Sequence, residues 1–147
     1  MEWCAKEYSE LSLDEFHDMI ALRIEVFVVE QNCPYQELDG KDKSSLHVLA
    51  KENGRIIGTT RVVPPGMSYD EVAIGRVVID PSYRGTGLGH SLMSETMKYI
   101  QEKYGNVPVR MSAQEHLQRY YSKHDFEVVS DMYLEDDIPH VQMLYTP

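Results

Sequence analysis

The segment from Gly75 to Tyr104 constrains this chain most, because it joins a strand pattern, a glycine loop and a helix pattern without a break. A β-branched run ends at Asp80-Pro81, three glycines follow within five residues, and an amphipathic pattern begins at Leu88. The N–H groups of a helix's first turn lack partners and carry partial positive charge, and glycines let an anion approach them closely. The segment therefore predicts an α/β fold that binds a phosphorylated ligand.

Length and composition indicate one domain over residues 1–147. The chain has 147 residues, 42% of them hydrophobic, with no linker-like stretch and no fixed repeat. It has no run of about 18 apolar residues and no signal-like start, so we expect a soluble, cytoplasmic protein without a membrane partner. The net charge of −10 argues against binding to nucleic acid.

Cysteines and carboxylates give no sign of a metal. Cys4 and Cys33 lack metal-ligand spacing, and their number suits a reducing compartment. The acidic run Glu135-Asp136-Asp137 has no histidine at ligand spacing, and such runs in turns are usually solvated. We therefore expect no bound metal.

The first half of the chain predicts a helix and a hairpin. Ser12 and Glu15 have the spacing of a capping box, which starts a helix. Asn53-Gly54 lies between two strand-like runs and favours a tight hairpin turn. The polar stretch from Glu30 to Ser45 predicts a long loop with a short helical turn. The apolar residues expected on the buried stripe of the first helix are Leu13, Phe16, Ile20, Ile24 and Phe27.

The second half predicts further strands around two helices. Gly105 stands where a C-cap glycine would end the helix from Leu88. Ser112 and Glu115 repeat the capping-box spacing and predict a helix through His124. Strands are expected over residues 3–8, 47–52, 56–63, 71–80, 107–113, 127–135 and 140–145. The apolar residues alternate between strand-like and helix-like spacing along the chain, which indicates a mixed α/β sheet.

The glycine loop does not match two common phosphate motifs. A dinucleotide fingerprint needs G-x-G-x-x-G, but His90 stands in its last place, and a P-loop needs Gly-Lys-Ser or Gly-Lys-Thr, which never occurs. The pattern R-x-x-G-x-G does fit, from Arg84 to Gly89, directly after a Val-Val-Ile-Asp strand. This pattern resembles the coenzyme A pyrophosphate loop of the GNAT family of N-acetyltransferases.

The resemblance covers nearly the whole chain. The order of strands and helices matches that of the family, and residues 120–126, Tyr-Tyr-Ser-Lys-His-Asp-Phe, look like its second signature. Asp125 replaces the usual glycine, but aspartate tolerates a left-handed cap. Residues 27–37, 112–114 and 138–140 look like the ElaA branch. The resemblance implies a mixed, mostly antiparallel, twisted sheet of about six to seven strands, with about four helices on both faces.

The resemblance also implies acetyl-CoA as donor and Tyr121 as general acid. A phenol with a pKa of about 10 is protonated at neutral pH and can give its proton to a departing thiolate; the alternative for Tyr121 is a core or lining aromatic. In the family, the strand before the loop hydrogen-bonds the pantetheine arm. The residues that the resemblance assigns to coenzyme A are Val77, Val78, Ile79, Arg84, Gly85, Thr86, Gly87, Leu88, Gly89 and His90.

The general base is left open by the sequence. A primary amine with a pKa of about 10.4 is protonated at neutral pH, so a group must accept its proton. The strand over residues 72–79 carries no carboxylate, unless Glu71 at its start reaches the site. His47, Glu30 and His140 are further candidates, each with an ordinary structural alternative, and a chain of water molecules is another.

Substrate contacts are assigned to four residues. Arg61 and Arg76 lie in apolar strand patterns, where a charge needs a partner or a solvent-filled cleft. Either one binds substrate or forms a structural ion pair with one of the many carboxylates. Glu30, in a loop rich in carboxylates, and His140 complete the set. Arg84 is expected to contact phosphate, the alternative being a solvated loop cation.

The predicted function is transfer of an acetyl group from acetyl-CoA to a primary amine by direct attack. Cys33 is the one residue that keeps a covalent route open. A non-catalytic acyl-CoA-binding module and a structural domain without a ligand are the alternatives. The acceptor remains open between a peptide, an amino sugar, a polyamine and a small metabolite. Similar folds are commonly dimeric, and the final strands offer a surface for a homodimer.

Overall fold

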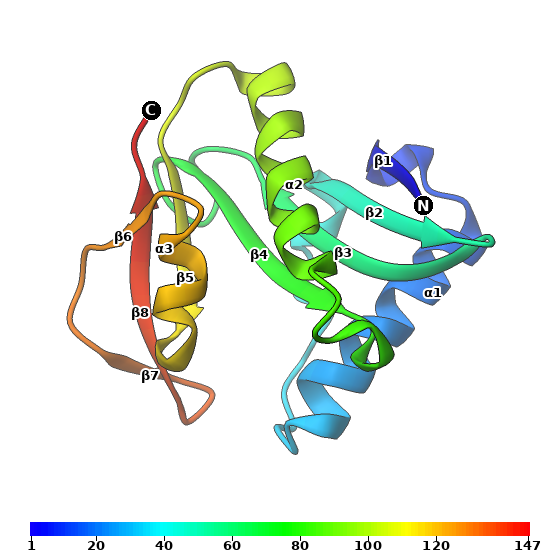
Figure 1. Ribbon diagram of the computed structural model, residues 1–147, viewed down its shortest axis with the longest axis horizontal. Helices are drawn as coiled ribbons and strands as arrows, with labels where there is room; N and C mark the ends of the chain where they lie inside the picture. The colour runs from blue at the N-terminus through cyan, green and yellow to red at the C-terminus, as the bar shows by residue number, and fades with distance from the viewer.

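The computed structural model describes all 147 residues as one sheet with helices on both faces (Figure 1). The mixed α/β class is confirmed, with eight strands rather than six to seven and three α-helices rather than about four. The other helical segments are short 3-10 turns and one π-helical turn, Glu25–Glu30, that extends α1. The elements are β1 (Glu2–Glu7), α1 (Leu13–Ile24), β2 (Leu46–Glu52), β3 (Arg55–Val63), β4 (Val72–Ile79), α2 (Leu88–Tyr104), β5 (Val109–Gln114), α3 (Gln118–Ser122), β6 (Phe126–Val128), β7 (Tyr133–Glu135) and β8 (Ile138–Tyr145).

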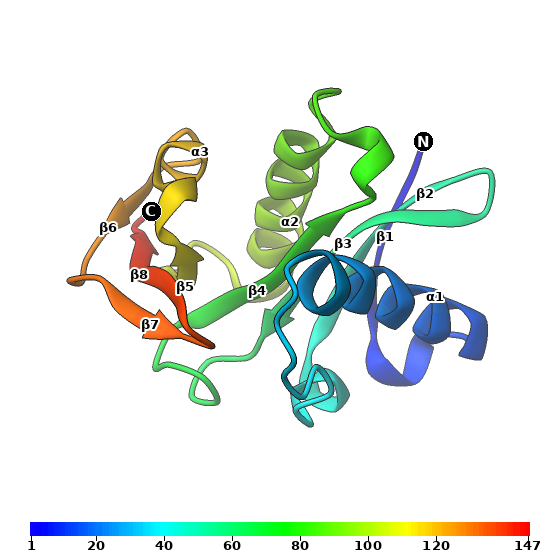
Figure 2. The ribbon, with the colours of Figure 1, turned by 90° about the horizontal axis from the view of Figure 1, so that it is seen from below.

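The sheet consists of two antiparallel halves joined by a short parallel contact. Its order is β1-β2-β3-β4-β5-β8-β6, and β7 also pairs with β8. The parallel pair β4–β5 is joined at two positions, Val72 with Val109 and Ala73 with Arg110. Beyond these positions the two strands separate, and Figure 2 shows the two halves diverging from this contact. The expected mixed, mostly antiparallel arrangement is confirmed.

Local sequence signals set several element boundaries as predicted. The Ser12 hydroxyl accepts from the Glu15 N–H at 3.0 Å, and the Glu15 carboxylate accepts from the Ser12 N–H at 2.8 Å, which completes the capping box. Asn53 and Gly54 both have positive φ, as a type I′ hairpin turn requires. Gly105 ends α2 at a φ of 81°, and its N–H donates to the Gln101 carbonyl.

The prediction of a second capping box, at Ser112 and Glu115, was wrong. β5 continues through Gln114, and the Ser112 hydroxyl bonds with the Tyr133 hydroxyl at 2.5 Å instead of capping a helix. The cause is long-range, since β8 pairs with β5 up to Gln114 opposite His140. A 3-10 turn and the short α3 then take the place of the longer helix.

The helices cover opposite faces of the sheet. Figure 2 shows α1 on one side and α2 and α3 on the other. On α1 the expected stripe was partly wrong: Leu13 is 89% exposed and Ile24 is 37% exposed, whereas Arg23 is 1% exposed. The buried face lies about one position away from the expected one and contains Glu15, Met19, Ile20, Leu22 and Arg23. None of the helices combines the length and the apolar character needed to cross a bilayer.

Glu15 ties the start of α1 to the sheet and makes stability pH-dependent. Burial alone would raise its pKa, but hydrogen bonds from Lys51 and Lys6 at 2.6 to 2.9 Å outweigh this and lower the pKa to about 2. An unfolded glutamate titrates near pH 4.3, so the stabilisation is complete above that pH and is lost as pH falls toward 2.

We expect Glu15→Gln to flatten the fall in unfolding free energy between pH 5 and pH 2.5, by up to about 3 kcal/mol. Urea unfolding at several pH values measures this slope. Glu102→Gln, at an exposed position of α2, is the matched control and should keep the wild-type slope. An unchanged slope in Glu15→Gln would show that the ion pairs do not carry the effect.

Candidate functional site

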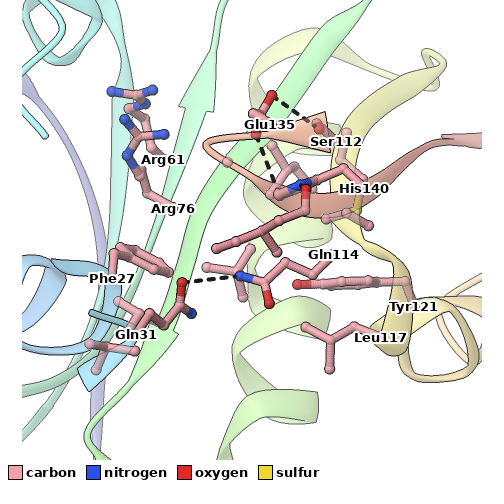
Figure 3. Close-up of a pocket in the computed structure, with 18 of the residues that line it drawn as sticks. Phe27, Gln31, Arg61, Arg76, Ser112, Gln114, Leu117, Tyr121, Glu135 and His140 are labelled. Atoms are coloured by element: carbon pink, nitrogen blue, oxygen red, sulfur yellow. Dashed lines mark hydrogen bonds and ion pairs between the residues drawn. The ribbon is translucent and has the colours of Figure 1, made fainter. Parts of the chain in front are cut away.

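A cavity of about 1070 Å³ lies where β4 and β5 separate. Both walls present strand edges without a backbone partner, because β4 is unpaired toward β5 after Ala73 and β5 is unpaired toward β4 after Arg110. Figure 3 shows side chains from both halves of the sheet pointing into this space. Such edges offer N–H and C=O groups to an extended ligand that carries amides.

A β-bulge shapes the β4 wall of the cavity. The register shifts so that Thr60 of β3 faces both Arg76 and Val77 of β4. Arg76 has a φ of 53°, a left-handed conformation that is unusual for a residue other than glycine. Bulges of this kind redirect side chains next to functional sites. Val77, Val78 and Ile79, predicted to contact the cofactor, follow directly and line the cavity.

The glycine loop joins the end of β4 to α2 at one end of the cavity. Gly85 and Gly87 have φ values of 80° and 85°, which favour glycine. The Asp80 carboxylate accepts from the Ser82 N–H at 2.9 Å, and this contact fixes the turn before the loop. Because Gly87 is the N-cap of the 17-residue α2, the loop places free N–H groups and the positive end of the helix dipole there.

The predicted loop residues lie in different environments. Arg84, Gly85, Gly87, Gly89 and His90 line the cavity. Arg84 is half exposed and forms an ion pair with Glu30 from the segment after α1. Leu88 is buried, and the Thr86 hydroxyl donates to the Tyr83 carbonyl at 2.5 Å, so their side chains belong to the framework of the loop.

An aromatic stack connects α2 to α3 beside the loop. His90 stacks on Tyr120 at 4.4 Å between ring centroids, and His90 Nδ1 lies 2.9 Å from His124 Nε2. Burial, and then the nearby His90, lower the pKa of His124. A Cβ built on Gly89 would overlap the Tyr120 hydroxyl, so Gly89 permits a close approach of the two helices.

Tyr121 extends from α3 into the cavity. Its side chain is 6% exposed, and Figure 3 shows its hydroxyl directed into the open space. Burial, and then the neighbouring Tyr120, raise the pKa of Tyr121 above the ordinary value for tyrosine. The phenol therefore stays protonated throughout the neutral pH range. The position of Asp125 at the end of this segment, with a φ of 66°, agrees with the predicted left-handed cap.

Charged side chains form the wall of the cavity on β3 and β4. Arg61 donates to the Asp39 carboxylate at 2.8 and 2.9 Å, and Arg76 Nε donates to Glu37 at 2.9 Å. Behind them, the buried Arg23 donates to Glu37 at 2.5 Å and to Asp42 at 2.8 Å. Arg61 and Arg76 thus both line the cavity and form structural ion pairs.

The facing wall comes from β5 and the β7–β8 hairpin. His140 Nδ1 lies 2.7 Å from the Ile138 carbonyl, and its Nε2 lies 3.5 Å from a Glu135 carboxylate oxygen. If Nδ1 carries the proton and donates it to the carbonyl, Nε2 keeps a free lone pair. Two contacts cross between the walls: Gln114 with Gln31 at 3.4 Å, and the Cys33 thiol with the Asp136 carbonyl at 3.6 Å.

Two of the candidate bases lie away from the cavity lining. Arg110 donates to Glu71 at 2.8 and 3.0 Å, which makes Glu71 the partner of a strand arginine. His47 is fully buried, its Nε2 lies 2.9 Å from the Asp42 carbonyl, and burial lowers its pKa. Glu30 and His140 do line the cavity. No group of three or more histidine, cysteine or acidic side chains is placed to hold a metal ion.

Several residues around the cavity were missed from the sequence. Arg23, Glu37 and Asp42 form the buried charge network, but their partners lie 14 to 19 positions apart in the chain. Gln31 and Gln114 meet across the cavity although 83 positions separate them. The one available signal was that both glutamines lie in segments that resemble the ElaA branch.

Comparison with known proteins supports the predicted resemblance. The acetyltransferase (GNAT) domain model matches residues 4–147. The ElaA protein of Escherichia coli K12 is 38% identical over 145 residues, which cover 97% of this chain and 95% of ElaA. The predicted resemblance to the ElaA branch is confirmed.

Solved structures confirm the GNAT-like fold. An acyl-CoA N-acyltransferase from Pseudomonas aeruginosa superposes with a TM-score of 0.94 at 41% identity, covering 99% of this chain and 100% of that one. E. coli ElaA superposes with a TM-score of 0.92 at 37% identity, covering 98% of each chain. An aminoglycoside 6′-N-acetyltransferase solved with coenzyme A gives 0.72 at 14% identity over 97% of this chain and 96% of that one, a likeness of fold alone.

Gly89 and Tyr120 provide a test of the loop geometry. We expect Gly89→Ala to destabilise the protein by about 1–3 kcal/mol, because the new methyl group displaces the Tyr120 hydroxyl. Tyr120→Phe removes that hydroxyl and leaves the next ring atom at 3.4 Å, so the double variant should recover much of the loss. Urea unfolding of the four proteins measures the coupling, and additive effects would contradict the contact.

Proposed function

The chain belongs to the GNAT family of acetyltransferases, and from this membership we propose that it transfers the acetyl group of acetyl-CoA to a primary amine by direct attack. The observation that carries the proposal is the continuity of the cavity. Its lining runs from the glycine loop at the start of α2, along the unpaired edge of β4, to the hydroxyl of Tyr121. A phosphate group, an amide-bearing arm and a reactive carbonyl would meet suitable groups in that order.

The donor half of the proposal uses backbone groups. The pyrophosphate would accept hydrogen bonds from the free backbone N–H groups in the first turn of α2, at the positive end of the helix. Arg84 would exchange its ion pair with Glu30 for the phosphate, since both side chains are partly exposed. The two amides of the pantetheine arm would pair with the β4 edge over residues 77–79, as an added strand does.

Tyr121 would act as the general acid. When the tetrahedral intermediate collapses, the C–S bond breaks and negative charge grows on sulfur. The protonated phenol donates a hydrogen bond, and then its proton, to that sulfur. Because burial raises the pKa of Tyr121, the phenol holds its proton at neutral pH and stabilises the sulfur first as a hydrogen-bond donor.

His140 is the best placed of the candidate bases. With Nδ1 donating to the Ile138 carbonyl, Nε2 would take the proton of the incoming ammonium, and the Glu135 carboxylate at 3.5 Å would stabilise the imidazolium that forms. Glu30 lies at the donor end beside Arg84, and Glu71 would act only by leaving Arg110. A chain of water molecules from the cavity is the remaining route.

Direct attack by the amine needs no covalent enzyme intermediate. The one cysteine at the cavity, Cys33, donates its thiol toward the Asp136 carbonyl and forms no hydrogen bond with a histidine or carboxylate side chain. Cys33→Ala should therefore leave turnover within about twofold of the wild type. A variant without activity would instead support a covalent acyl-cysteine.

Tyr121→Phe tests the acid. We expect kcat to fall by about 100-fold or more, because the leaving sulfur loses its proton donor, while the Kd for acetyl-CoA changes little. Release of free thiol measures kcat, and calorimetry measures Kd. Tyr99→Phe, on α2 and outside the cavity lining, is the matched control. An equal loss of binding and rate in Tyr121→Phe would assign Tyr121 to packing.

A non-catalytic acyl-CoA-binding module is the second candidate, and binding alone separates it from an enzyme. We expect acetyl-CoA to raise the Tm, as a ligand that binds the folded state does. We also expect acetylated product from at least one member of a library of amines, measured against background hydrolysis of acetyl-CoA. A thermal shift without transfer to any amine would favour the binding module, and no shift would exclude both.

A further inference from the structure

Three basic residues line the cavity on the side of β3 and β4: Arg61 from β3, Arg76 from β4 and Lys41 from the 3-10 turn Lys41–Ser44. The two guanidinium groups contact the Asp39 carboxylate, Arg61 at 2.8 and 2.9 Å and Arg76 at 3.5 Å, whereas Lys41 donates to it at 3.0 Å through its backbone N–H. All four residues line the cavity. Figure 3 shows the guanidinium groups of Arg61 and Arg76 side by side on this wall.

The charges on this wall do not cancel. Arg23, Arg61, Arg76 and Lys41 are four cations, whereas Glu37, Asp39 and Asp42 are three carboxylates. Burial alone would raise the pKa of Asp39, but hydrogen bonds from Arg61 and Lys41 lower it to about 2, so this carboxylate is ionised at neutral pH. His47 behind them stays neutral, because burial lowers its pKa. One positive charge is left over.

That excess charge is accessible from the cavity. Arg76 donates from Nε and Nη2 to Glu37 and Asp39, which leaves Nη1 available, and its side chain is 22% exposed. The Lys41 ammonium has one partner, the Ser68 hydroxyl at 3.0 Å. The β-bulge holds Arg76 in its left-handed conformation at this point of the wall.

The opposite wall carries the opposite charge. Glu135 and Asp136 come from the β7–β8 hairpin, and Glu135 is half exposed beside His140. Figure 3 places Glu135 and His140 across the cavity from Arg61 and Arg76. The acceptor end of the cavity is therefore bipolar, with a cationic side on β3 and β4 and an anionic side on the hairpin.

We propose that the acceptor is a zwitterion, an amine that also carries a carboxylate. Its carboxylate lies against Arg76 and Lys41, and its ammonium faces Glu135 and His140 before it loses a proton. A single excess positive charge matches a monoanion better than a doubly charged phosphate ester. A polyamine would place a second ammonium against Arg76, and like charges at such a site are costly. The proposal rests on the proposed acetyl transfer at the same cavity.

The test uses coenzyme A conjugates that reach the acceptor end. The sulfur of coenzyme A is alkylated with bromoacetyl derivatives of amino acids of increasing length, starting with glycine and β-alanine, and with the matched carboxamides. Each pair differs only in the charge of the terminal group. Calorimetry gives Kd for each conjugate and for unmodified coenzyme A.

We expect at least one chain length at which the carboxylate binds about tenfold more tightly than its carboxamide. Lys41→Met and Arg76→Gln should each reduce that ratio toward one without changing the Kd of unmodified coenzyme A. Lys41→Met is the cleaner variant, because its ammonium contacts Ser68 alone, whereas Arg76 supports the buried Glu37. Lys98→Met, on the exposed face of α2, is the matched control and should keep the full ratio.

Each other outcome has a defined meaning. A ratio near one at every chain length, or a preference that survives in both variants, overturns the zwitterionic acceptor while leaving acetyl transfer intact. Tighter binding of conjugates that end in a second amine also overturns it and points to a polycation. If unmodified coenzyme A fails to bind, the proposed function falls, and this inference falls with it.

Discussion

The separation of β4 from β5 after two residue pairs is the constraint on which the site depends. A strand edge inside a protein normally pairs, because unsatisfied N–H and C=O groups are costly when buried. Here the edges of β4 and β5 instead face a cavity of about 1070 Å³. The glycine loop lies at the end of β4, and α3 with Tyr121 follows β5. The separation of the two strands therefore sets the positions of both the loop and Tyr121.

Three polar or aromatic contacts join the two diverging halves around the cavity. The His90–Tyr120–His124 stack joins α2 to α3, Gln31 meets Gln114 at 3.4 Å, and Cys33 reaches the Asp136 carbonyl at 3.6 Å. These contacts supplement an apolar core that contains residues of both halves, such as Val62 and Ile74 on one side and Met111 and Met143 on the other. A ligand between β4 and β5 would supply the hydrogen bonds that the sheet lacks there.

The features that sequence alone could predict are those set by neighbouring residues. The capping box at Ser12, the turn at Asn53-Gly54 and the loop from Arg84 to Gly89 depend on local backbone preferences, and the structure has all three. The helix start predicted at Ser112 was wrong because cross-strand pairing with β8 outweighed the capping preference of this residue. The ion pair of Glu71 with Arg110 could not be predicted from the sequence, because 39 positions separate the two residues.

The buried charge network is better explained by positioning than by stability. Burying Arg23, Glu37 and Asp42 removes three charges from water, and apolar side chains of similar volume often stabilise a fold equally well. Charged side chains, however, pair in fixed directions and so hold their neighbours in place. Glu37 lies between Arg23 and Arg76, and Tyr35 lies 5.6 Å from the Arg76 guanidinium while its hydroxyl donates to Glu37. Residues 35–42 are thereby fixed against the bulge of β4, which holds the Arg76 guanidinium at the cavity wall.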